Sequence, residues 1–191
     1  MKSKFLMICA AGLLFVGMVG SAIATPIQWT TASGGNGHWY DIVVSDLTWE
    51  NAQATTLAAG DHLATITSVE EQTFVANLLA GHTNPGVGGF MIGGFQPSGS
   101  SEPTGGWQWV TGETWGYTNW GGSEPNNAGG EGYLYMDERY SWGWNDYTNA
   151  GGYYNPQGYI SESAPVPEPA TMLLFGLGIL GIAGVSRKKL K

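Results

Sequence analysis

The residues most able to do chemistry lie between positions 124 and 146. They supply three carboxylates and two side-chain amides, from Glu124, Asn126, Glu131, Asn145 and Asp146. Oxygen donors of this kind suit Ca²⁺, which takes about 6–8 ligands. His and Cys, the donors that favour zinc or copper, do not occur in this stretch. The sequence therefore predicts a cation site built from oxygens alone, with these five side chains as candidate ligands.

The same residues also fit less specific roles, which stay open as alternatives. Glu124, Asn126 and Glu131 can belong to a solvated acidic loop, while Asn145 and Asp146 can close a turn, where these residue types are common. A glycosidase would need two carboxylates about 5–10 Å apart in a cleft, and a metal-bound carboxylate is a poor general acid. The three histidines are scattered, and the sequence has no Gly-x-Ser-x-Gly nucleophile motif. We therefore expect a non-catalytic protein.

Two helices are expected ahead of this region. Thr48 can cap a helix over 49–59, which Gly60 would end in the left-handed conformation. Ser68 and Glu71 form a capping-box pattern at the start of a second helix. One face of that second helix is apolar and is expected in the core; it consists of Phe74, Val75, Leu78 and Leu79.

Short strands separated by long loops make up most of the remaining pattern. Strands are expected at 38–44, 90–92, 107–110, 133–136, 142–146 and 159–160. The segment 117–130 is a long loop that holds the first candidate ligands, and binding sites often lie on such loops. Trp144 is expected as a core anchor. Helices followed by a run of strands are typical of an α+β domain.

The charge of the chain is unevenly distributed. All 15 acidic residues lie between 41 and 168, whereas six of the seven basic residues lie at the two ends, so that Arg139 is alone in the body. The body therefore carries a formal charge near −14 (1 − 15). Such a surface repels phosphate backbones, so no nucleic-acid partner is expected, and it attracts cations. The acidity can equally serve solubility alone.

Residues 1–24 are expected to be a secretory signal peptide. Lys2 and Lys4 precede an apolar run, and Ala22-Ile23-Ala24 supplies a small-x-small cleavage site. The run is short for a membrane span of about 20 residues, although an N-terminal anchor stays an alternative. The sequence thus predicts export.

Residues 164–191 form a separate C-terminal segment. Val166-Pro167-Glu168-Pro169 is followed by an apolar run over 170–185 and a basic tail. This arrangement resembles the PEP-CTERM sorting signal of Gram-negative bacteria that produce exopolysaccharide. The resemblance implies a short transmembrane helix, processing by an exosortase near the proline motif, and delivery to the cell envelope, cell surface or extracellular matrix. An ordinary tail anchor is the alternative.

The body of the chain resembles the C-type lectin-like domain family. The matching blocks follow the family's order at 47–53, 60–66, 91–94, 107–109, 117–120, 124–126, 131 and 144–146. The resemblance implies an α+β fold over 25–163, with two helices, short antiparallel strands and a long Ca²⁺-binding loop.

The resemblance also implies a role for the candidate ligands. All five would bind the principal Ca²⁺, the peptide bond before Pro125 would be cis, and two adjacent sugar hydroxyls would complete the coordination shell. The same side chains would hydrogen-bond those hydroxyls. Glu124 followed by Asn126 matches members that prefer mannose- or glucose-type sugars, whereas the Gln-then-Asp order accompanies galactose. The implied cation-binding and carbohydrate-binding residues are Glu124, Asn126, Glu131, Asn145 and Asp146.

The chain departs from the family at several positions. Thr56, Tyr133 and Ser161 occupy three positions where the family has disulfide cysteines, so the usual support of the long loop is altered. Asn127 stands where members with an auxiliary Ca²⁺ have an acid, so a second ion is not expected.

The sequence as a whole predicts an exported module, directed to the envelope or matrix, that binds carbohydrate in a Ca²⁺-dependent way. The alternative is a non-catalytic adhesion or scaffold module of the matrix that binds protein, with Ca²⁺ as a structural brace only. The expected partners are an exopolysaccharide or surface glycan, an exosortase-type enzyme and, before processing, the membrane.

Overall fold

The structure, a computed structural model, describes residues 25–82, 88–149 and 156–165. The expected signal peptide (1–24) and nearly all of the expected sorting segment (166–191) lie outside the described residues. Within the described ranges, no helix has both the length and the apolar character needed to cross a membrane. The expected span over 170–185 is not among the residues that this finding covers.

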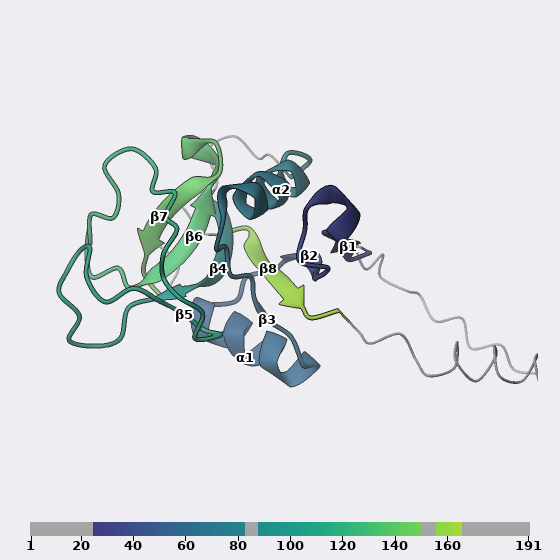
Figure 1. Ribbon diagram of the computed structural model, residues 1–191. Helices are drawn as coiled ribbons and strands as arrows, with labels where there is room; N and C mark the ends of the chain where they lie inside the picture. The colour runs from purple at the N-terminus through teal and green to yellow at the C-terminus, as the bar shows by residue number, and fades with distance from the viewer. Residues whose placement is uncertain (1–24, 83–87, 150–155, 166–191) are drawn as a thin grey trace, which may run out of the picture.

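A single mixed sheet of eight strands forms the centre of the domain (Figure 1). Its strands are β1 (Ile27–Gln28), β2 (Trp39–Val44), β3 (His62–Leu63), β4 (Gly89–Phe95), β5 (Gln108–Trp109), β6 (Tyr133–Asp137), β7 (Gly143–Tyr147) and β8 (Gly158–Ser163). The order is β1-β2-β8-β4-β6-β7, with β3 beside β8 and β5 beside β4. The pair β4–β8 is parallel and the other strand pairs are antiparallel.

Two α-helices flank this sheet, as expected. In α1 (Trp49–Ala59) the Thr48 side chain accepts from the backbone N–H of Asn51, and Gly60 ends the helix with φ of 87°. In α2 (Val69–Leu79) the Ser68 side chain accepts from the N–H of Glu71.

The capping box of α2 is formed only in part. The carboxylate of Glu71 accepts from the N–H of Thr67, at 2.7 Å, and not from the N–H of the cap residue Ser68. Glu71 is 2% exposed, because it also accepts a hydrogen bond from Tyr40 on the sheet. Two short 3₁₀ helices complete the fold, at Thr31–Ser33 and Glu138–Tyr140.

The two faces of the sheet carry separate apolar clusters. Leu134 and Met136 of β6 pack in the cluster that includes Val75 of α2. Tyr135, between them in sequence, belongs to the second cluster with Trp49 of α1. Since side chains alternate along a strand, this split places α2 and α1 on opposite faces, as Figure 1 shows.

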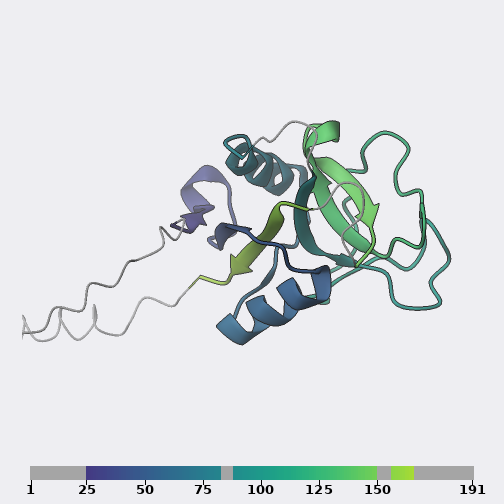
Figure 2. The ribbon, with the colours of Figure 1, turned by 180° about the vertical axis from the view of Figure 1, so that it is seen from behind.

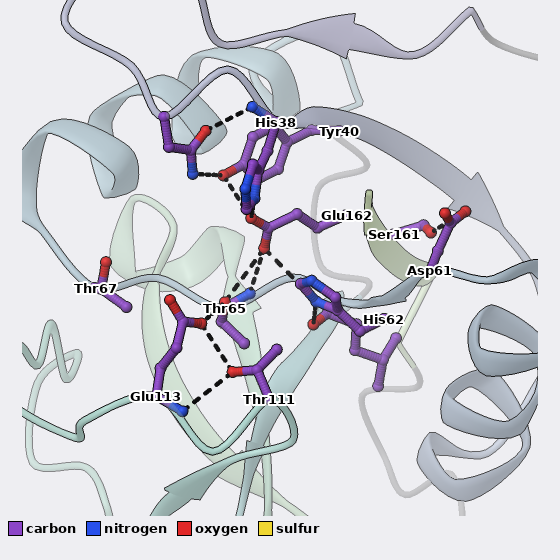
Figure 3. A network of polar contacts seen from close by, with 12 residues as sticks. His38, Tyr40, Asp61, His62, Thr65, Thr67, Thr111, Glu113, Ser161 and Glu162 are labelled. Carbon is purple, nitrogen blue, oxygen red and sulfur yellow. Dashed lines mark hydrogen bonds and ion pairs between the residues drawn. The ribbon is translucent and has the colours of Figure 1, made fainter. Parts of the chain in front are cut away.

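A buried polar network joins the N-terminal strands to β8 (Figure 3). Glu162, 1% exposed, accepts from the N–H of Thr65 at 2.9 Å and from the hydroxyl of Tyr40 at 3.0 Å. His38 Nδ1 lies 2.6 Å from its carboxylate. Burial, together with the charges of Glu162 and Glu71, raises the pKa of Tyr40, so this hydroxyl stays protonated and donates. The core therefore keeps its buried carboxylates paired.

The observed strands agree with most of the expected ones, with three differences. The two-residue strands β1 and β3 were not expected, because neither has a recognisable pattern of its own. β4 (Gly89–Phe95) and β8 (Gly158–Ser163) are both longer than the expected 90–92 and 159–160. The parallel pairing of β4 with β8 makes the sheet mixed, where antiparallel strands alone were expected.

Candidate functional site

The long loop between β5 and β6 is fastened to strand β7. Trp120 forms an isolated parallel bridge with Trp144, whose side chain is fully buried as expected. The N–H of Gly121 donates to Trp144 O at 2.8 Å, and the N–H of Trp144 donates to Asn119 O at 2.7 Å. Figures 1 and 2 show the loops after β4 projecting from the end of the domain opposite β1. The loop is thus held against β7 at 119–121, and its aromatic side chains, Trp115, Tyr117 and Trp120, pack on the core.

Glu124 and Asn126 lie side by side on this loop. The Glu124–Pro125 peptide bond is cis, as the family resemblance implied. Asn126 Nδ2 donates to Glu124 Oε2. The other oxygen of Glu124 accepts from the hydroxyl of Tyr140 at 2.9 Å. Both side chains are therefore oriented by neighbours rather than free in solvent.

Asp146 joins β7 to the same part of the loop. Its carboxylate accepts from the backbone N–H of Asn126 at 3.0 Å and from that of Asn127 at 2.7 Å. Asp146 is fully buried, so these charge-assisted bonds form away from water. These two hydrogen bonds hold the loop, with its candidate ligand Asn126, against the candidate ligand Asp146 of β7.

Glu131 closes the loop on its other side. Its carboxylate accepts from the N–H of Ala128 at 2.8 Å, and its own N–H donates to Asn127 Oδ1 at 2.7 Å. Burial raises the pKa of Glu131 to about 7, and the negative charges of Asp146 and Glu124 add to the effect. Burial likewise raises the pKa of Glu124, again with a contribution from Asp146. The three carboxylates therefore repel one another across the loop.

Asn145 lies next to Asp146 but has different partners. Its Nδ2 donates to the Tyr135 hydroxyl at 2.9 Å and to Asp137 Oδ2 at 3.3 Å. Neighbouring residues on a strand face opposite ways, which separates the side chains of Asn145 and Asp146. The structure thus brings Glu124, Asn126, Glu131 and Asp146 into one hydrogen-bonded group and does not bring the Asn145 side chain into it.

The donor set fits a hard cation. Among the described residues, no three His, Cys, Asp or Glu side chains are grouped closely enough to hold a metal by themselves. The candidate set, however, includes two amides, and Asn145 Oδ1 is buried without a hydrogen-bond partner. A buried polar atom of this kind needs an explanation, and an ion is one. A divalent cation would also relieve the repulsion that raises the pKa of Glu131. These residues therefore fit Ca²⁺, which favours such oxygens.

Sequence reasoning did not identify the residues that surround the candidate ligands. Tyr135, Asp137 and Tyr140 each donate to, or accept from, one of them. One signal was available: Arg139 is the single basic residue of the body and lies two positions after Asp137. Such an isolated charge pair inside an acidic domain could have marked the segment as a support for the site.

Comparison with protein families gives two matches. The model of the lectin C-type domain matches residues 45–151. The model of the PEP-CTERM protein-sorting motif matches residues 165–188. The first match contains all of the candidate ligands, and the second contains the proline motif and the apolar run.

Individual relatives and solved structures agree with the first match. The C-type mannose receptor 2 of Mus musculus is 31% identical over 103 residues, which are 54% of this chain and 6% of the receptor. The chain thus spans a small part of that relative. A mouse scavenger receptor C-type lectin carbohydrate-recognition domain superposes with a TM-score of 0.55 and 25% identity, over 69% of this chain and 92% of that chain.

A further solved structure shares the fold alone. A calcium-independent type II antifreeze protein superposes with a TM-score of 0.56 and 24% identity, over 76% of this chain and 98% of that chain. The fold is therefore compatible with more than one kind of binding surface.

Proposed function

The chain belongs to the lectin C-type domain family, and from this premise we propose that it is a Ca²⁺-dependent carbohydrate-binding module, exported to the cell envelope or matrix. The observation that carries the proposal is the grouping of Glu124, Asn126, Glu131 and Asp146 where the long loop meets β7. The family is generally non-enzymatic. The proposed cation-binding and carbohydrate-binding set is Glu124, Asn126, Glu131, Asn145 and Asp146.

The side chains of the site have complementary hydrogen-bonding roles. The carboxylates of Glu124 and Glu131 accept hydrogen bonds from sugar hydroxyls, while the amide of Asn126 donates to a hydroxyl lone pair. When bound, Ca²⁺ would supply coordination positions for two adjacent hydroxyls and offset the negative charge of the loop. The order of Glu124 and Asn126 across the proline supports a preference for mannose- or glucose-type sugars.

The C-terminal match supports a proposal for where the module acts. A PEP-CTERM motif implies export to the surface or envelope of a Gram-negative bacterium. We propose removal of a signal peptide over 1–24, a lectin domain over 25–163, and exosortase processing of the segment 164–191. The long loop projects from the end of the domain opposite β1 (Figures 1 and 2).

A glycan array tests the proposed function directly. The exported chain is applied with millimolar Ca²⁺ and again with excess chelator, alongside Glu124→Ala and a control variant, Glu70→Ala. Glu70 is an exposed acid of α2, so the control makes the same change in net charge away from the loop. We expect mannose- or glucose-type signals that disappear with chelator and in Glu124→Ala but persist in Glu70→Ala. Signals that are insensitive to chelator would contradict the proposal.

One observation favours a second candidate function, a scaffold module that binds protein. Asn145 Nδ2 donates within the protein, to Tyr135 and Asp137, and Asn126 Nδ2 donates to Glu124. Fewer donors are then available for sugar hydroxyls, while the oxygens can still bind a cation. Ca²⁺ binding by calorimetry together with a silent glycan array would support this alternative.

A further inference from the structure

Four residues behind the candidate ligands form one continuous network. They are Tyr135 and Asp137 of β6 and Arg139 and Tyr140 of the 3₁₀ turn that follows it, and we call them the Arg139 network. It touches the proposed site at two points, through Asn145 and through Glu124. Nothing in the proposed function so far requires it.

The network fixes which way the Asn145 amide faces. The Tyr135 hydroxyl donates its proton to Asp137 Oδ2 at 3.1 Å and accepts from Asn145 Nδ2 and from Arg139 Nη2. Its one donor and two acceptor positions are therefore all used. A reversed amide would place Oδ1 against the Asp137 carboxylate, which has no proton to offer, and against the Tyr135 hydroxyl, whose proton is donated to Asp137. The observed orientation avoids this conflict, and it leaves Asn145 Oδ1 without a hydrogen-bond partner.

Arg139 holds the carboxylate of Asp137 in place. Asp137 is fully buried, and it accepts from Arg139 N at 2.8 Å, from Nε at 3.0 Å and from Nη2 at 2.5 Å. These hydrogen bonds fix the carboxylate in the position where it accepts from Asn145 Nδ2.

The second point of contact is Glu124. The guanidinium of Arg139 lies over the ring of Tyr140, with 5.5 Å from its central carbon to the ring centroid. That ring carries the hydroxyl that donates to Glu124 Oε1 at 2.9 Å. One arginine thus supports one candidate ligand from the loop and another from β7.

We propose that the Arg139 network is a positioning device for the cation site. It presents Asn145 through its oxygen and holds Glu124 through Tyr140. This inference rests on the proposed Ca²⁺ site and adds the residues that set its geometry.

The first test is Tyr135→Phe, with Tyr133→Phe as the matched control. Both lie on β6, but the Tyr133 hydroxyl donates to Glu50 of α1 rather than to the network. Ca²⁺ affinity is measured by calorimetry on the whole chain. Loss of an outer partner of a metal ligand weakens binding about 10-fold or more, so we expect that loss in Tyr135→Phe and wild-type affinity in Tyr133→Phe.

Substitution of Arg139 provides a second test, in which the direction of the change in Ca²⁺ affinity distinguishes an effect of charge from an effect of positioning. The positive charge of Arg139 lowers the pKa of both Glu124 and Glu131, so charge alone predicts that Arg139→Gln binds Ca²⁺ more tightly than wild type. Positioning predicts weaker binding. Arg139→Lys keeps the charge but loses the two-pronged contact with Asp137, and should also bind more weakly. If Arg139→Gln fails to fold, Tyr135→Phe and Arg139→Lys decide.

A measurement without metal distinguishes the two proposals. In the Ca²⁺-free protein, the side-chain NH₂ signals of Asn145 should exchange slowly with water by NMR, and faster in Tyr135→Phe. Wild-type protein that binds no Ca²⁺ would overturn the proposed site and this inference together. Wild-type binding with equal affinity in Tyr135→Phe, or tighter binding in Arg139→Gln, would overturn the inference alone.

Discussion

Glu131 shows how burial and like charge act on a single carboxyl group of the site. Its pKa is raised from 4.5 in the ordinary state to about 7 in the folded chain, first by burial and then by Asp146 and Glu124. The folded state therefore holds this proton more tightly than the unfolded state. The resulting stabilisation is complete below pH 4.5 and is lost as the pH rises through about 7.

The matched variant Glu131→Gln isolates this effect. Glutamine does not titrate, so without Ca²⁺ the stability of wild type relative to Glu131→Gln should fall as the pH rises from 4.5 to 7 and then level off. In wild type, Ca²⁺ affinity should rise over the same interval, because binding needs the ionised carboxylate. Urea denaturation at several pH values measures the first effect and calorimetry the second. A stability difference that does not change with pH would contradict the assignment.

Sugar preference is the second prediction at this scale. Exchanging Glu124→Gln together with Asn126→Asp reverses the order of carboxylate and amide across the cis bond. Because acceptors and donors then face the sugar in the opposite order, selectivity should move from mannose- or glucose-type sugars toward galactose. Competition with the free monosaccharides measures the change, and an unaltered preference would contradict the coordination scheme.

The residue types of the site could be predicted from the sequence, but their partners could not. The candidate ligands are recognisable because oxygen-bearing side chains gather between 124 and 146 and match blocks of the family's sequence pattern. Tyr140 reaches Glu124 only because a 3₁₀ turn after β6 directs it back to the loop. Tyr135 meets Asn145 because they are register partners on β6 and β7. Contacts of this kind depend on strand register, which a local pattern does not reveal.

At the scale of elements, close packing between strands depends on glycine at one position of β4. A Cβ on Gly89 would overlap the carbonyl oxygen of Met136 on β6. Gly89→Ala should therefore destabilise the domain by about 3 kcal/mol or more, while Gly81→Ala, where the added carbon meets no atom within 4 Å, should change stability by less than about 0.5 kcal/mol. Chemical denaturation compares the two variants. A Gly89→Ala domain of wild-type stability would contradict the close approach of β4 and β6.

Glu162 joins β8 to Thr65 and Tyr40 through buried hydrogen bonds (Figure 3). Glu162→Ala leaves the N–H of Thr65 and the hydroxyl of Tyr40 without this acceptor, so we expect a loss of about 3–5 kcal/mol. Glu113 also contacts Thr65 but is exposed, so Glu113→Ala should cost less than about 1 kcal/mol. Urea denaturation measures the stability of both variants. An equal loss of stability in the two would contradict the claim that the burial of Glu162 makes its hydrogen bonds more stabilising than those of Glu113.

The helices were predictable because the residues that cap their ends are adjacent to them in the sequence. Thr48, Gly60 and Ser68 each act at the helix end where they were expected. The carboxylate of Glu71 was assigned to the wrong partner because Tyr40, distant in sequence, draws it into the core. The parallel contact of β4 with β8 likewise joins segments far apart in the chain, and no local pattern indicates it.

At the scale of the whole molecule, the sheet, the long loop and the acidic charge all favour the proposed cation site. The sheet holds β7 rigidly, the loop closes over it, and an acidic body with Arg139 as its single Lys or Arg residue attracts cations. The loop lies at the end of the domain opposite β1 (Figure 2).

The most direct measurement is anomalous diffraction from a crystal soaked in Ca²⁺. We expect one anomalous peak where the long loop meets β7, with oxygens of the five proposed ligands at about 2.3–2.6 Å, the usual Ca²⁺–oxygen distance. Asn145 should contribute Oδ1 while its Nδ2 stays on Tyr135. Ordered water among these side chains and no anomalous peak at millimolar Ca²⁺ would show that they do not form a Ca²⁺ site.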